Sequence, residues 1–178
     1  MEQIIESIKI SITTKNYLSA LGISLTLPDI CGWLRGEQST PRRFQSFFES
    51  YLSDLYTSNV GASNRKTTFM TGDDLYALRC AYLHQGSDDI TGQRARDTLD
   101  RFKLVAGETG QLLHRNLLND RTVPDGRTLL IDVPTFCMEL VAGTVKFLDE
   151  HGTNPDVEER RKRLGNIAVL APGRRTLL

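Results

Sequence analysis

The segment DDLYALRCAYLHQG, residues 73–86, carries the clearest structural signal in this chain. Thr71 can cap a helix that starts here, the two acids suit the positive end of the helix dipole, and the final glycine is a natural stop. On an ideal helix with about 100° per residue, Leu75, Leu78 and Tyr82 lie on one face. A second face consists of small residues and a histidine: Ala77, Cys80, Ala81 and His84. The segment therefore predicts an internal helix that another helix can approach closely.

Arg79 and His84 are the residues of this helix that can carry chemistry. They are five positions apart, so their directions differ by roughly 140° and we expect them to be poor partners within one straight helix. Two copies of the helix that meet about a two-fold axis would place both residues of each copy in a shared cleft. Arginine binds phosphate through bidentate hydrogen bonds, and histidine transfers protons near neutral pH. The pair is therefore a candidate for cutting RNA without a metal ion.

The run from Arg79 to His84 resembles the Arg-x4–6-His signature of the HEPN superfamily (higher eukaryotes and prokaryotes nucleotide-binding domain). The resemblance implies a helical bundle, a homodimer with the motif at its interface, and metal-independent endoribonuclease activity with Arg79 and His84 as the catalytic pair. Many members act as toxins paired with antitoxins, or in abortive infection and antiphage defence. It therefore implies a bacterial protein with RNA as substrate and an antitoxin as a further partner.

Three other residues of the segment are assigned supporting roles at this site: Cys80, Tyr82 and Asp74. Active ribonucleases of the superfamily usually have a polar residue where this chain has Cys80. An alternative is therefore a non-catalytic HEPN-like dimer that binds nucleotide or RNA, or serves as an interaction module. A third reading is a purely structural helical domain, in which Arg79 pairs with Asp73 or Asp74 and His84 interacts with the helix dipole.

The rest of the N-terminal half also predicts helices. Apolar residues at three- and four-residue steps predict a helix over residues 2–22, ended by Gly22. Residues 25–34 form a buried connection or a short helix opened by Pro28, and Thr40 caps a firmer helix with Pro41 at its first position. Its core stripe is Phe44, Phe47, Phe48 and Tyr51. The polar residues 57–68 are expected to form a loop.

Residues 101–131 have a different pattern, which predicts a small antiparallel sheet or hairpin inserted in the helical domain. Its strands would be residues 101–105, 111–114 and 127–131, with a turn at residues 123–126. His114 and Arg115 follow the second of these runs and are candidate RNA contacts, or else a solvated strand end. After the insertion, Asp132 can cap a long helix that Gly152 ends.

The composition is that of one globular domain. The chain has 178 residues with 22 basic and 22 acidic side chains, so bulk charge gives no argument for nucleic-acid binding. Its three cysteines and three histidines have no metal-ligand spacing, and no apolar run is long enough to cross a membrane. The basic run at residues 160–163 is a solvated helix face, with RNA contact as the alternative. We therefore expect a cytoplasmic, mainly α, HEPN-like domain over residues 1–178, without cofactor or metal.

Overall fold

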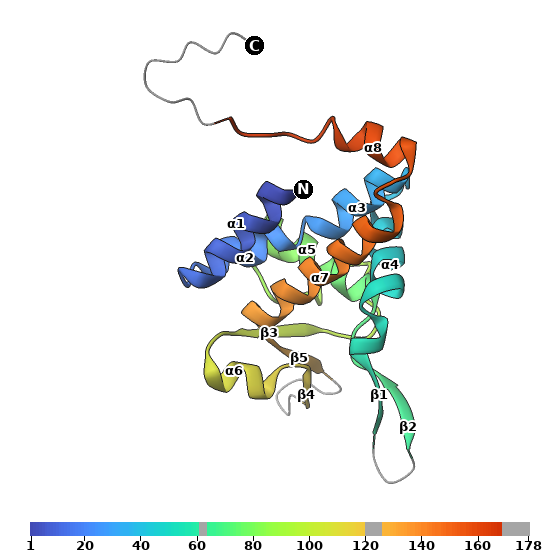
Figure 1. Cartoon of the computed structure of the whole chain (residues 1–178). Coiled ribbons are helices and arrows are strands. Elements are labelled where there is room, and N and C mark those ends of the chain that lie inside the picture. Colours follow the sequence, from blue (N-terminus) through green and yellow to red (C-terminus); the bar gives the residue numbers. More distant parts are fainter. Residues whose placement is uncertain (61–63, 120–125, 169–178) are drawn as a thin grey trace.

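The computed structural model describes residues 1–60, 64–119 and 126–168. It is mainly helical with two small sheets, so the coarse fold prediction is confirmed (Figure 1). The helices are α1 (Glu2–Thr13), α2 (Tyr17–Ser24), α3 (Leu27–Arg35), α4 (Thr40–Tyr51), η1 (Ser53–Tyr56), α5 (Gly72–Gln85), α6 (Glu108–Leu113), α7 (Val133–His151) and α8 (Pro155–Arg161). The strands are β1 (Thr57–Val60), β2 (Arg65–Thr68), β3 (Arg101–Val105), β4 (Asn116–Asn119) and β5 (Arg127–Asp132).

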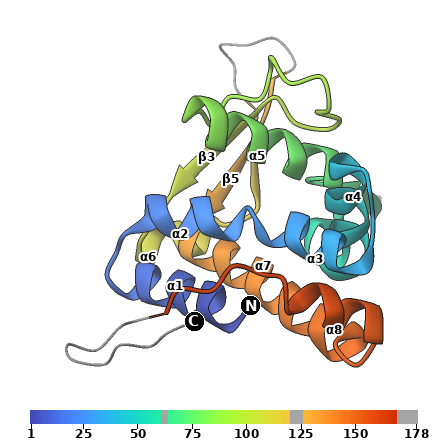
Figure 2. The same ribbon diagram turned by 90° about the horizontal axis from the view of Figure 1, so that it is seen from above.

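The long helix α7 is the centre of the helical layer. It contacts α1, α2, α3 and α4 along its length and β5 near its start. Asp132 caps it as predicted, because the Asp132 carboxylate accepts the Thr135 backbone N–H at 3.1 Å. Seen from above, α2 and α3 lie in a line between α7 and α5 (Figure 2). The predicted aromatic stripe of α4 is buried in this core.

The sheet of the inserted region has the order β3-β5-β4 and is mixed, not purely antiparallel. β4 and β5 are antiparallel, whereas β3 and β5 run parallel, with Phe102 opposite Leu129. The prediction of a strand at residues 111–114 is wrong, because residues 108–113 form α6. A parallel pair needs a crossover between its strands, and α6 with β4 supplies it. The predicted turn at residues 123–126 lies, apart from Gly126, outside the described residues.

Thr57–Val60 and Arg65–Thr68 pair as the antiparallel strands β1 and β2, where the sequence predicted a polar loop. The N-terminal prediction also needs correction, since residues 2–22 contain two helices and not one. Asn16 starts the second by accepting the Ser19 backbone N–H, so Gly22 lies inside α2 and does not end a helix. α4 is capped at Ser39, one residue before the predicted Thr40.

The stretch Tyr17–Arg35 has the length and mean hydropathy, 1.2, of a membrane-spanning segment. Half of it is buried inside the fold, and it is divided between α2 and α3. Four of its leucines, Leu21, Leu25, Leu27 and Leu34, are almost completely buried in the core, whereas Leu18 is exposed. The apolar character of this stretch is therefore accounted for by the core of a globular domain.

Candidate active site

The predicted internal helix is α5, and its start is as the sequence indicates. Thr71 and Asp74 form a reciprocal capping box, and Gly86 ends the helix in a left-handed conformation with φ 64°. The close helix approach occurs at Gly72, where a Cβ atom would lie 2.5 Å from the Cα of Gln45 on α4. The start of α5 is therefore packed against α4, whereas its C-terminal turn lies at the surface.

Arg79 and His84 meet directly within this one helix. The Arg79 Nη1 atom lies 3.0 Å from the His84 Nε2 atom. The expectation that the two are poor partners in one helix is therefore wrong. Five residues advance an α-helix by only about 7.5 Å, a distance that the long arginine side chain spans in spite of the difference in direction. His84 is exposed, whereas Arg79 is half-buried.

The contact assigns the proton on His84. A guanidinium has no acceptor, so Arg79 must donate and the Nε2 atom of His84 must accept with its lone pair. The neutral ring then has its proton on Nδ1. At the other side of the guanidinium, Arg79 Nε is buried without a hydrogen-bond partner. The arginine therefore has a buried stem, while its outer end is held against an unprotonated imidazole nitrogen.

The three supporting residues point elsewhere. The Tyr82 hydroxyl donates to the Leu18 carbonyl of α2 at 3.2 Å, and burial raises the Tyr82 pKa. The contact of the Cys80 thiol with the Tyr76 hydroxyl, more than burial, raises the pKa of Tyr76. Tyr76 is the residue that the sequence argument missed, although it lies one turn before Cys80 on the same face. Arg79 also acts on Tyr76, because its positive charge opposes this rise in the Tyr76 pKa.

Asp74 is completely buried and fixes the loop that follows α5. Its Oδ1 atom accepts three successive backbone N–H groups, those of Asp97, Thr98 and Leu99, at 3.0, 3.0 and 3.1 Å. Its Oδ2 atom accepts the backbone N–H of Thr71 at 3.0 Å. Asp73 in turn accepts from Gln45. Both carboxylates thus have other partners, and the alternative in which one of them pairs with Arg79 does not occur.

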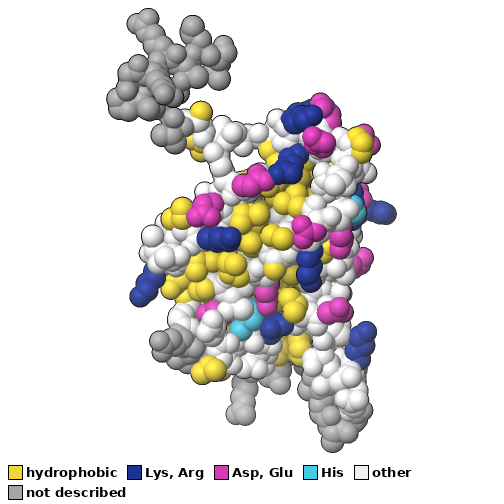
Figure 3. Space-filling view, viewed as in Figure 1, with side chains coloured by type: hydrophobic (Ala, Val, Ile, Leu, Met, Phe, Trp, Pro, Cys, Tyr) yellow, Lys and Arg dark blue, Asp and Glu magenta, His cyan; other side chains and the backbone are white. Residues whose placement is uncertain are grey.

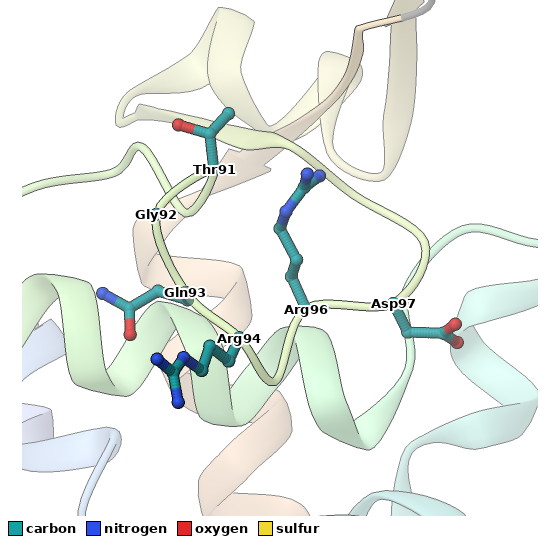
Figure 4. Close-up of a pocket in the computed structure, with 6 residues that line it drawn as sticks. All are labelled: Thr91, Gly92, Gln93, Arg94, Arg96 and Asp97. Atoms are coloured by element: carbon teal, nitrogen blue, oxygen red, sulfur yellow. The ribbon is translucent and has the colours of Figure 1, made fainter.

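The loop of residues 87–100 contains an open hollow of about 480 Å³ beside α5 (Figure 4). Arg96 points into the space that the loop encloses, and it forms an ion pair with Asp100 (Figure 4). Arg101 is paired with Asp89 at 2.7 Å; hydrogen bonds from Thr91, followed by that from Arg101, lower the pKa of Asp89 to about 2. Of the two arginines that line the hollow, Arg96 is compensated by Asp100 and only Arg94 is not ion-paired within the described part of the chain, so we assign no phosphate site to the hollow. It is lined by Thr91, Gly92, Gln93, Arg94, Arg96 and Asp97.

His114 and Arg115 belong to a separate polar network below α7. The side chain of His114 is 4% exposed, its Nε2 lies 3.1 Å from Glu139, and its Nδ1 accepts the backbone N–H of Asp132 at 3.1 Å. The Tyr56 hydroxyl donates to Glu139 at 2.5 Å, and Arg115 lies 3.7 Å from the same carboxylate. Both His114 nitrogens therefore bind within the protein, and only Arg115 has a partly exposed side chain.

The sequence signal for this network was weak, because its members come from η1, the α6–β4 connection and α7. Arg115 has a left-handed backbone, φ 65°, which is uncommon for a residue with a side chain.

Among the described residues, no group of three His, Cys, Asp or Glu side chains gathers as a metal site would require. Comparison of the chain with family models, with curated proteins and with solved structures gave no match.

Proposed function

We propose that this protein is a metal-independent endoribonuclease of HEPN type, with Arg79 and His84 as its catalytic residues. The observation that supports the proposal most is the 3.0 Å contact between Arg79 Nη1 and His84 Nε2 at the exposed end of α5. Arginine can bind phosphate, and the unprotonated Nε2 atom of His84 can accept a proton once Arg79 turns from it to the phosphate. Cleavage of a phosphodiester needs these two groups, a cation to stabilise the phosphate charge and a base to take the proton of the 2′-hydroxyl.

The proposed reaction starts with the 2′-hydroxyl of the RNA. His84 Nε2 takes its proton while the 2′-oxygen forms a bond to phosphorus, and the bond from phosphorus to the 5′-oxygen breaks. The leaving 5′-oxygen takes a proton from the protonated imidazole of a second copy's His84, which gives a 2′,3′-cyclic phosphate and a 5′-hydroxyl. Arg79 stabilises the charge that develops on the non-bridging oxygens, after its Nη1 has moved from His84 to the phosphate.

A second copy of the chain completes this scheme. The reaction needs a base at the 2′-oxygen and an acid at the 5′-oxygen, whereas the α5 site of one copy has a single imidazole. Two copies related by a two-fold axis would bring two His84 side chains and two Arg79 side chains to one cleft. We therefore propose a homodimer with α5 at its interface.

The test is incubation of the purified protein with RNA in the presence of EDTA. Wild type should cut the RNA and leave a 2′,3′-cyclic phosphate, and Arg79→Ala and His84→Ala should each lose at least about a hundredfold of the rate. Lys146→Ala, on the exposed face of α7, is the control that should retain it. A well-folded dimer that cuts no RNA, or cleavage that survives both substitutions, would contradict the proposal.

A second candidate function is a HEPN-like module that binds nucleotide or RNA without cutting it. It is favoured by the Cys80 thiol, which contacts Tyr76 and supplies no support to the Arg79–His84 pair. This candidate predicts RNA affinity that Arg79→Ala weakens, with no cleavage product. Expression in a bacterial host separates the two, because only a toxin-like ribonuclease should arrest growth, and the Arg79/His84 double variant should not arrest it.

A further inference from the structure

The outer side of α7 carries apolar side chains that the fold leaves open. Met138 and Val145 are 40% and 43% exposed, and Ala142, which lies between them, is exposed as well. Because the three residues are spaced by four and then by three positions, their side chains form one stripe along the helix. Helices pair through a seam of this spacing in coiled coils. The outer side of α7 is therefore suited to contact with another helix.

The neighbouring helix α1 extends this apolar surface. α1 contacts α7, and its side chains Ile5 and Ile12 are only half-buried. Hydrophobic side chains gather into one area over α1 and α7, and charged side chains lie at the edges of that area (Figure 3). We call this area the α1–α7 face, and it consists of Ile5, Ile12, Met138, Ala142 and Val145. Since monomeric proteins rarely expose a large continuous apolar surface, we expect a partner to cover this face.

Two charged side chains of α1 indicate which partner fits. Glu6 and Lys9 are exposed, and neither forms an ion pair within the described part of the chain. They lie equally far from the midpoint of α1 (Glu2–Thr13), one toward each end. When a second copy of α1 lies beside the first in the opposite direction, Glu6 of each copy faces Lys9 of the other. This charge complementarity favours a second copy of the chain as the partner.

The stripe on α7 has the same symmetry. Ala142 is the central residue of α7 (Val133–His151), so a two-fold axis across it places the small Ala142 side chains of two copies opposite each other. Met138 and Val145 then pack on either side of this central contact. Because α1 and α7 run in roughly opposite directions, a single axis across both helices reverses each of them (Figure 1). The formal net charge of zero adds no overall repulsion between the copies.

We infer that the α1–α7 face is a self-association surface, on which two copies pack their α7 helices antiparallel and form Glu6–Lys9 ion pairs between the copies. This contact differs from the proposed interface at α5, because α2 and α3 lie between α5 and α7 (Figure 2). The inference therefore does not rest on the proposed ribonuclease activity. A chain that uses both surfaces assembles beyond a dimer, since each copy then contacts two others.

The first test places a thiol at the two-fold axis. In full-length Cys80→Ser protein, the two remaining cysteines, Cys31 and Cys137, are buried. Adding Ala142→Cys should give a disulfide-linked dimer when copper phenanthroline is supplied as the oxidant, because the two introduced thiols face each other across the axis. Leu112→Cys is the control: Leu112 is 84% exposed on α6, outside the α1–α7 face, and should give less than about a tenth of that linked dimer. No linked dimer from Ala142→Cys, or as much from Leu112→Cys, would overturn the inference.

The second test measures the dissociation constant of self-association by sedimentation velocity at about 50 mM salt. Glu6→Lys and Lys9→Glu should each raise it at least about fivefold, because each places like charges opposite each other at two symmetric positions. The double variant Glu6→Lys/Lys9→Glu has the net charge of wild type and should return to within about twofold of it. A double variant that associates as weakly as the single variants would contradict the antiparallel arrangement.

The third test puts a charge into the apolar contact. Val145→Asp should raise the dissociation constant at least about tenfold, because association would bury an unpaired carboxylate from each copy, whereas Leu112→Asp should leave it unchanged. Circular dichroism and thermal melting of each variant establish that it is folded. Wild type and Val145→Asp with equal masses at every concentration would show that a second copy does not cover the face. Since no test measures RNA cleavage, and pairing through α5 does not bring the thiols at position 142 together, this inference and the proposed function fail separately.

Discussion

His84 and His114 are both hydrogen-bonded to charged partners, yet their surroundings are opposite. His84 lies exposed at the end of α5 with Arg79 as its partner, whereas the side chain of His114 is 4% exposed and lies between Glu139 and the backbone of Asp132. His114 has both nitrogens occupied inside the protein. His84 has its Nε2 occupied by a side chain that phosphate can draw away. A histidine in a complete buried network fixes the fold, and one in an exposed pair is available for chemistry.

The largest effect on stability is expected at Glu139, whose carboxylate binds both Tyr56 and His114 in the buried network. Glu139→Ala should lower the free energy of unfolding by about 3 kcal/mol, because Tyr56 and His114 stay buried and lose their acceptor. Glu150→Ala is the matched control: Glu150 also accepts a tyrosine hydroxyl, that of Tyr51 at 2.8 Å, but its side chain is 58% exposed. Glu150→Ala should lower the free energy of unfolding by less than about 1 kcal/mol. Equal losses in urea unfolding would show that burial does not distinguish the two.

The next largest difference in the free energy of unfolding is expected between the alanine variants of the two histidines. His114→Ala should cost about 2 kcal/mol, because the backbone N–H of Asp132 and the Glu139 carboxylate each lose a partner. His84→Ala should change the free energy of unfolding by less than about 0.5 kcal/mol, since its ring is exposed. Urea unfolding of both variants at neutral pH measures the contrast. A large loss in His84→Ala would make the α5 pair a structural element, against our proposal.

Alkaline pH should weaken the buried network. Burial, and then the Glu139 carboxylate, raises the pKa of Tyr56 well above its usual 10. Above pH 10 the unfolded chain therefore ionises Tyr56 while the folded chain keeps it neutral, so the stability falls as pH rises, by at most about 1.4 kcal/mol per pH unit from this group. Tyr56→Phe should reduce that slope in unfolding measurements from pH 9 upward. An unchanged slope of stability against pH would show that ionisation of Tyr56 does not cause the loss.

The smallest expected effect is a difference in proton position between the rings of His84 and His114. Nitrogen NMR should find the proton of the neutral ring on Nδ1 in His84 and on Nε2 in His114. Addition of inorganic phosphate should shift the His84 Nε2 resonance and leave His114 unchanged, because only Arg79 can exchange its partner. The same tautomer at both residues, or an equal response to phosphate, would remove the difference between the two sites.

Signals local in sequence were sufficient for part of this molecule. The capping box at Thr71, the end of α5 at Gly86 and the cap of α7 at Asp132 could be predicted, because each depends on residues within one turn. The helix at residues 108–113 could not, since a short apolar run fits a strand or a helix equally well. Its helical state follows from the parallel pairing of β3 with β5.

The sequence indicated Arg79 and His84 as candidate residues but did not predict the contact between them. The helical wheel gives directions and not the reach of a long side chain, so it missed the bond between Arg79 and His84. The roles of Asp74 and Tyr82 depend on partners far away in sequence, the loop at residues 97–99 and the Leu18 carbonyl. Tertiary contacts of this kind leave no periodic signal in a single sequence.

The parallel β3–β5 pair also constrains how the chain can be assembled during synthesis. Phe102 of β3 is completely buried in the finished protein, and Leu129, which lies opposite it, belongs to a strand that leaves the ribosome after α6 and β4. α7, which covers this sheet, comes later still. During synthesis, Phe102 therefore stays uncovered until the last third of the chain has emerged, although α5 is already complete. Translation must run well beyond Arg79 and His84 before the sheet and α7 can close around Phe102.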